Sequence, residues 1–224
     1  MPYLRDTAIV LKKEPFREQD RRYVMYGREH GLLTAVARGS SLKSSKQAGH
    51  LEPFSIIEVM IAKGSAFDKL AVARAQGPSR PPDVRLASFA ILGAFHDLVV
   101  SLTRPGISDP QIFDLLHELR TVCFSFPSDP SPERSRLLFA AATLKLLDLT
   151  GFGPPIEVEE DDLSHTALLL SFARKSPLAD VIRVTATTDL LSATASWIED
   201  ALRHTPLTQA PRGPLTIRAL LERN

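Results

Sequence analysis

Hydrophobic and polar residues alternate with a period near two through the first third of the chain. Five short runs have this pattern: TAIVLKK, RRYVMYG, GLLTAVA, FSIIEVMIA and KLAVARA. Alternation puts every second side chain on the same face of a strand, and Val, Ile and Tyr favour such pleated surfaces. Five short strands in about 75 residues predict a small barrel, because a barrel limits the exposed strand edges.

The pattern changes after a proline-rich segment, QGPSRPPD, at residues 76–83. Its three prolines remove backbone donors and restrict their neighbours, so neither a helix nor a central strand continues through it. We expect a domain boundary here, with one domain over residues 1–78 and a second over residues 79–224.

Apolar residues in the second part recur at the helical spacing of three and four. The faces they form contain Val84, Ile91, Leu92, Phe95, Leu98 and Val99, then Ile112, Leu115, Leu116 and Leu119, then Leu137, Ala141, Leu144 and Leu147. Asp109-Pro110, Ser131-Pro132 and Ser176-Pro177 each place a capping oxygen before a proline, which predicts helix starts. Further helices are expected near residues 164–175, 177–184, 188–204 and 214–222. The predicted fold class is α+β, a five-stranded barrel followed by an all-α domain.

Charge is distributed unevenly along the chain. Residues 1–76 hold 13 Lys/Arg and 8 Asp/Glu, a net charge of +5, whereas the whole chain has a net charge of +1. Such an asymmetry indicates a segment that binds a polyanion, although solvated strand faces would give the same count.

Recognisable catalytic and metal-binding patterns are missing from the sequence. There is no phosphate-binding glycine loop, and six scattered histidines form no H-E-x-x-H pair. Cys123, the single cysteine, is expected in the core, and the acidic run at residues 157–162 is expected to be a solvated loop. We therefore predict no enzyme activity, no cofactor and no metal. With no signal peptide or apolar run long enough to cross a bilayer, the expected location is the cytoplasm, with no membrane partner.

A basic, serine-rich stretch separates the third and fourth predicted strands. It carries Arg38, Lys43 and Lys46 with four serines and no carboxylate before Glu52. Single-stranded nucleic acid is bound by cationic grooves and by aromatic faces that stack on bases. The candidates for phosphate contact are Arg17, Arg21, Arg22, Arg28, Arg38, Lys43 and Lys46. Phe16, Tyr23 and Tyr26 lie near these residues in sequence; Tyr23 and Tyr26 are the candidates for base stacking, with a place in the core as the alternative for either ring.

Four ordered motifs in this region resemble the N-terminal part of the RecO family of recombination mediators. They are E-x-D at Glu18–Asp20, R-E-x-G at Arg28–Gly31, A-R-G at Ala37–Gly39 and L-x-P-F at Leu51–Phe54. The resemblance implies an OB-fold followed by a helical domain. It also implies binding to single- and double-stranded DNA, annealing of complementary strands and association with the nucleoid. The implied partners are RecR and the single-stranded-DNA-binding protein SSB, with which members load the recombinase RecA.

The resemblance also implies a pocket for the acidic C-terminal tail of SSB in the helical part. Arg120, Arg134 and Arg136 are the candidates, since arginine pairs with a free carboxylate. Many members carry four cysteines for zinc after the motif that reads Leu147–Pro154 here, but no cysteine follows it. We expect that loop to be held by packing alone. A non-enzymatic protein–protein adaptor whose barrel does not bind DNA is the alternative function.

Overall fold

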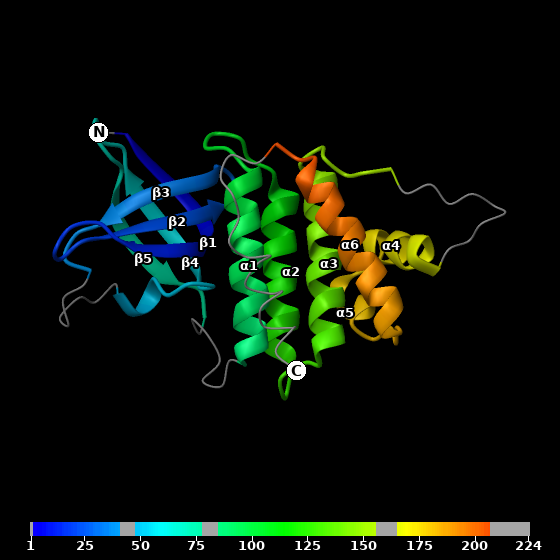
Figure 1. Cartoon of the computed structure of the whole chain (residues 1–224). Helices are drawn as coiled ribbons and strands as arrows, with labels where there is room; N and C mark the ends of the chain where they lie inside the picture. Colours follow the sequence, from blue (N-terminus) through cyan, green and yellow to red (C-terminus); the bar gives the residue numbers. More distant parts are fainter. Residues whose placement is uncertain (1, 41–47, 78–84, 156–164, 207–224) are drawn as a thin grey trace. The chain divides into compact units, whose positions relative to one another are not determined.

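The structure is a computed structural model that describes residues 2–40, 48–77, 85–155 and 165–206 (Figure 1). The strands are β1 (Tyr3–Pro15), β2 (Arg21–Gly27), β3 (Gly31–Ala37), β4 (Ile56–Ala62) and β5 (Lys69–Ala75), and a short 3-10 helix, η1 (Ala48–His50), lies between β3 and β4. The helices are α1 (Leu86–Leu102), α2 (Pro110–Ser125), α3 (Pro132–Leu149), α4 (His165–Lys175), α5 (Leu178–Val181) and α6 (Thr188–Arg203). The predicted fold class is confirmed.

The five strands form a closed barrel in the order β1-β2-β3-β5-β4. The long β1 pairs with both β2 and β4, and its register shifts between Val10 and Lys12. Such a bulge bends a strand, which lets β1 serve both neighbours. Parallel pairing of Val36 with Lys69 closes the barrel between β3 and β5, and the Val36 N–H donates to the Asp68 carbonyl at 2.9 Å. This is an OB-fold barrel.

Alternating side chains of the strands fill the barrel interior. The cluster contains Ala8, Val10, Tyr23, Met25, Leu33, Ala35, Ala37, Leu51, Ile57, Val59, Ile61, Leu70 and Ala73. Leu51, from the segment before β4, is completely buried among them. Because side chains of native cores pack densely, a ligand of this domain has to bind on its outside.

The packing of the chain divides it into two compact units. One combines the described part of residues 1–83 with Thr103–His117, and the other combines the described parts of residues 84–102 and 118–224. The barrel unit therefore recruits a segment that follows α1 in the chain. The predicted linker lies mostly outside the described residues, so a boundary at residue 78 remains a prediction.

Polar contacts fix Thr103–His117 to the barrel. The Tyr26 hydroxyl donates to the Asp109 carbonyl at 3.3 Å and accepts from the Asp109 N–H at the same distance. Arg28 forms an ion pair with Asp114 through two hydrogen bonds, at 2.8 and 3.3 Å. Pro105 forms isolated bridges with Gly31 and its neighbour.

In the second unit, α3 packs against α1, α4, α5 and α6, and most of its residues are buried. Two predicted helix starts are confirmed. The Ser131 hydroxyl accepts from the Arg134 N–H before α3, and the Asp109 carboxylate accepts from the Gln111 N–H at 2.8 Å at the start of α2. Cys123 is buried as predicted, and burial raises the pKa of its thiol.

The prediction of a cap at Ser176 is wrong. Pro177 takes the N-cap position of α5 and offers no side-chain acceptor, while the Leu178 N–H donates to Glu118 Oε1 at 2.7 Å. A carboxylate distant in sequence thus replaces the expected local hydroxyl. The predicted helix at 177–184 is reduced to α5, and the one predicted at 214–222 lies outside the described residues.

Charged groups hold the described start of the loop that follows α3, residues 150–155, which corrects the expectation that packing alone holds it there. Arg174 of α4 donates to the Pro154 carbonyl at 2.8 Å, and its Nε lies 2.8 Å from Asp148 Oδ2. Lys145 Nζ donates to the Arg174 carbonyl at 3.1 Å. Burial raises the pKa of Asp148 while Arg174 lowers it, and burial lowers the pKa of Lys145.

Replacing Arg174 with alanine is expected to lower the free energy of unfolding by about 1–3 kcal/mol, because it leaves a partly buried carboxylate and carbonyl without their partner. Denaturant unfolding measures this loss. The matched control is Arg183→Ala, which breaks an exposed ion pair with Asp180 and is expected to cost no more than about 0.5 kcal/mol. Equal losses in the two variants would show that Arg174 does not hold the loop.

Candidate nucleic-acid interface

Three connections of the barrel meet at one end. The β1–β2 loop, Phe16–Asp20, is joined to the end of β3 by a hydrogen bond from the Gly39 N–H to Asp20 Oδ1 at 2.9 Å. The β4–β5 loop, residues 63–68, reaches the same place, since Asp68 bonds to β3 and Phe67 contacts Phe16. We call residues 16–22, 38–40 and 63–68 the arginine end.

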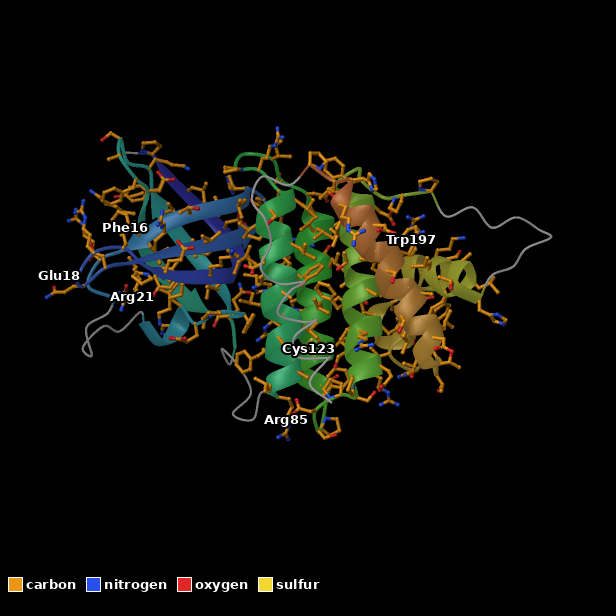
Figure 2. All side chains as sticks on the ribbon, viewed as in Figure 1. Phe16, Glu18, Arg21, Arg85, Cys123 and Trp197 are labelled. Carbon is orange, nitrogen blue, oxygen red and sulfur yellow. The ribbon has the colours of Figure 1, made fainter. Side chains whose placement is uncertain are left out.

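Four predicted phosphate-binding residues lie at the arginine end. Arg17 belongs to the β1–β2 loop, Arg21 and Arg22 begin β2, and Arg38 follows β3 (Figure 2 labels Arg21). The antiparallel register pairs Arg21 with Ala37, so Arg21 and Arg38 lie at the same end of the β2–β3 hairpin. Arg17, Arg22 and Arg38 are exposed, and Arg21 is partly exposed. The fold therefore gathers cations that are up to 21 positions apart in sequence.

Two of the carboxylates at or beside this end already form contacts within the protein. Glu14 Oε2 lies 3.1 Å from Arg22 Nε, and Asp20 accepts the Gly39 N–H. Glu18 is exposed in the β1–β2 loop. Arg21 makes a long contact, 3.4 Å, with the Asp20 carbonyl, so its charge is not neutralised by a described ion pair. Among the described residues, Arg38 likewise has no ion pair.

An aromatic pair joins two loops at the arginine end. The rings of Phe16 and Phe67 meet edge to face, with centroids 5.3 Å apart, and both are partly exposed. The Arg17 guanidinium lies 5.4 Å from the Phe16 centroid and 5.5 Å from the Phe67 centroid. Arg22 lies 5.7 Å from Phe16. Neither phenylalanine was predicted to stack on a base, although Phe16 adjoins Arg17 in sequence and Phe67 is the one aromatic residue in the turn KGSAFDK.

The prediction that Tyr23 or Tyr26 stacks on a base is wrong, because both side chains are completely buried. Tyr23 points into the barrel core. Tyr26 lies on the outside of the barrel but is bound to Asp109 of the recruited segment. Neither ring is accessible to a nucleotide.

Arg28 is separated from the other candidates. It follows the opposite end of β2 from Arg21, its guanidinium is paired with Asp114, and it lies 5.3 Å from the Phe113 ring centroid. Its charge holds the recruited segment, so it does not extend the arginine end. Lys43 and Lys46 lie outside the described residues, and their predicted phosphate contacts remain predictions.

The barrel part of the chain is similar to known proteins of one family. Residues 1–78 match the family model described as the N-terminal part of recombination protein O. The chain is 38% identical over 82 residues to the DNA repair protein RecO of Cutibacterium acnes, covering 37% of this chain and 33% of that protein. The barrel part of the chain is therefore similar to the N-terminal part of RecO-family proteins.

Longer matches extend past the barrel into the helical part. RecO of Desulforudis audaxviator is 28% identical over 150 residues, which are 66% of this chain and 57% of the relative. RecO of Rubrobacter xylanophilus is 27% identical over 161 residues, which are 70% of this chain and 61% of the relative. The chain thus spans between about a third and three fifths of the length of these relatives.

The motifs that resemble the RecO family occupy structural positions in the barrel. Asp20 of the first motif binds Gly39 of the third, whose φ of 61° favours glycine. In the fourth motif, Leu51 fills the core, and the Phe54 N–H donates to the Val10 carbonyl at 2.9 Å. Asp20 and Gly39 thus shape two of the connections at the arginine end, whereas Leu51 and Phe54 fix the segment before β4 to the barrel.

The three arginines predicted for an SSB tail lie on α2 and α3. Arg120 is partly buried and lies 4.6 Å from the Phe124 ring centroid, and burial lowers its pKa. Arg134 is exposed in the first turn of α3, and Arg136 is partly exposed. Their role in tail binding remains a prediction.

The described residues contain neither a metal-binding cluster nor a helix that could span a membrane. Within the described ranges, no three or more His, Cys, Asp or Glu residues are grouped so that they could hold a metal ion. No helix in that part of the chain has both the length and the hydropathy of a membrane span.

Proposed function

We propose that this chain belongs to the RecO family and acts in DNA repair as a recombination mediator without catalytic activity of its own. It binds single- and double-stranded DNA with little sequence preference and anneals complementary strands. Together with RecR it helps to load the recombinase onto SSB-coated DNA. The names of its relatives, DNA repair protein RecO, support the pathway.

The observation that carries the proposal is the arginine end. OB-folds bind oligonucleotides at the β2–β3 face and at the β1–β2 and β4–β5 loops, and the four gathered arginines lie on these elements. Guanidinium groups pair with phosphate oxygens, which fix a strand without reading its sequence. Weak sequence preference is what annealing of arbitrary strands requires.

Replacing Arg21 and Arg38 with alanine in the full chain is expected to weaken binding of all single-stranded sequences about equally. Each neutralised phosphate contributes roughly 0.7 to the slope of log affinity against log salt, so loss of two contacts flattens the slope by roughly 1.4. Fluorescence anisotropy across a salt series measures both quantities. The same change is expected for Lys43→Ala with Lys46→Ala.

The matched control for this experiment is Arg183→Ala, which removes an exposed arginine from the helical unit. It is expected to leave affinity and slope unchanged. A wild-type slope in the Arg21/Arg38 variant would remove these two residues from the interface. Absence of binding by the wild-type chain at low salt would instead favour the adaptor function.

The full chain is required because the recruited segment belongs to the barrel unit. A fragment ending near residue 80 would lack the Asp109 and Asp114 partners of Tyr26 and Arg28. Failure of such a fragment to bind DNA could therefore follow from unfolding.

The proposal extends to partners through the family resemblance. The acidic tail of SSB is assigned to the helical unit, with Arg120, Arg134 and Arg136 as candidates for its terminal carboxylate. Exposure of Arg134 supports access by a peptide, and the ring contact of Arg120 supports a fixed guanidinium beside an apolar surface. The proposal assigns no surface of this chain to RecR binding.

A further inference from the structure

We infer that Phe16 and Phe67, together with Arg17, form a site on which an unpaired base of single-stranded DNA stacks. This inference rests on the proposed function and adds selectivity to it. Phosphate contacts alone do not distinguish a single strand from a duplex by its bases, whereas an aromatic face accepts only a base that is free of its pair.

Exposure and position support the site. Both rings are partly exposed, unlike the buried Tyr23 and Tyr26. Phe16 comes from the β1–β2 loop and Phe67 from the β4–β5 loop. The Arg17 guanidinium lies over both rings, at 5.4 and 5.5 Å from their centroids, so a guanidinium group and two aromatic rings together form the surface at this place. Guanidinium planes and aromatic rings are the two surfaces on which proteins stack unpaired bases.

Both rings are held in place before any ligand arrives. The β4–β5 loop that carries Phe67 is fixed by Asp68, which accepts from the Gly64 N–H at 3.1 Å and from Lys63 Nζ at 2.8 Å. In the β1–β2 loop, the Phe16 N–H donates to the Asp20 carbonyl at 3.3 Å. Loops that are already ordered lose less conformational entropy when a strand binds.

Arginine side chains near the two rings can bind the phosphates of the same DNA strand. Arg21 and Arg38 lie at the same end of the β2–β3 hairpin, and the Arg22 guanidinium lies 5.7 Å from the Phe16 centroid. Backbone phosphates can pair with these cations while the base turns toward the rings. Phosphate and base are then held by different residues, which allows the two contributions to be separated experimentally.

The test compares two single strands of equal length and charge, oligothymidylate and a chain of abasic residues. Stacking is worth ~1–3 kcal/mol per base, so the wild-type chain is expected to prefer thymidylate by about 5- to 150-fold. In a Phe16→Leu/Phe67→Leu variant this ratio is expected to fall toward one. Affinity for the abasic strand and its salt slope should stay at wild-type values, since leucine preserves apolar packing without a π face.

Two matched variants complete the design. Phe67→Tyr keeps the aromatic face and is expected to retain the preference for thymidylate. Phe172→Leu removes an exposed phenylalanine from the helical unit, and it is expected to change nothing. Iodouracil in the strand should photo-crosslink to residue 16 or 67 in the wild-type chain, and mass spectrometry identifies the attachment site.

Each other outcome overturns the inference in a recognisable way. An unchanged ratio in the double leucine variant means that no base stacks on this pair. Equal loss for both strands, with normal thermal unfolding, means that the rings only position the phosphate-binding loops. Absence of binding to either strand by the wild-type chain refutes the proposed function itself.

Discussion

The Gly31→Ala variant is expected to lose about 2–5 kcal/mol of unfolding free energy, the sum of two separate costs. Gly31 has a φ of 64°, where a Cβ costs roughly 1–2 kcal/mol. That Cβ would also collide with the Ile107 carbonyl oxygen, and it would lie 2.9 Å from the Ile107 carbonyl carbon. Overpacking of this kind adds typically 1–3 kcal/mol. Equilibrium unfolding in urea measures the total.

Gly106→Ala is the matched control because it separates strain from collision. Gly106 also has a positive φ, 81°, but a Cβ there would meet no heavy atom within 4 Å. The control is expected to lose only the conformational cost, roughly 1–2 kcal/mol. If both variants lose the same amount, Thr103–His117 does not pack on the barrel as described.

The strands were predictable because one face of each is buried in the barrel. The observed bounds of β2, β3 and β5 are those of the runs RRYVMYG, GLLTAVA and KLAVARA. Alternation in these runs follows directly from an interior that accepts every second side chain. Helix starts at Ser131 and Asp109 were predictable for a similarly local reason, since the capping oxygen is within three residues of the N–H it accepts.

Contacts between distant segments were beyond such reasoning. Alternation places Tyr26 outside the barrel, where a local pattern predicts access to solvent, yet a segment 83 residues further along the chain binds its hydroxyl. Arg28 is likewise neutralised by a carboxylate 86 residues away. A basic residue is available to a ligand only if it forms no ion pair within the folded chain, and sequence alone does not reveal such ion pairs between distant segments.

The aromatic part of the candidate site shows the same limit. Phe16 and Phe67 stand in two different loops, and neither loop has a periodicity that fixes where its side chains point. Their contact follows from barrel closure, through the bond between Val36 and Asp68 beside Phe67. The resemblance to the RecO family gave the fold but gave no reason to select these rings over the tyrosines.

Tyr26→Ala is expected to lower the unfolding free energy of the barrel unit by about 3–5 kcal/mol, as for other large buried aromatic side chains. The ring is completely buried although it lies outside the barrel core, so its removal leaves a cavity beneath the recruited segment. Tyr26→Phe keeps the ring and removes only the hydroxyl that meets Asp109, for an expected loss of about 1–2 kcal/mol. Similar losses in the two variants would mean that the ring contributes little.

The dependence of stability on alkaline pH distinguishes the contribution of the Tyr26 hydroxyl from that of its ring, with no variant beyond Tyr26→Phe. Burial raises the pKa of Tyr26 above its ordinary value of 10.0, and the nearby Asp109 carboxylate adds to the rise, while the hydrogen bond to the Asp109 backbone opposes it. Below pH about 10 the hydroxyl is neutral in both states, so its stabilising contribution is complete. As the pH rises further, the unfolded chain releases this proton before the folded chain does, and the contribution is lost progressively toward the folded pKa.

The stability difference between wild type and Tyr26→Phe is therefore expected to be constant from pH 7 to 9 and to shrink above pH about 10. A difference that stays constant, or grows, above that pH would show that the folded environment does not raise the pKa of Tyr26.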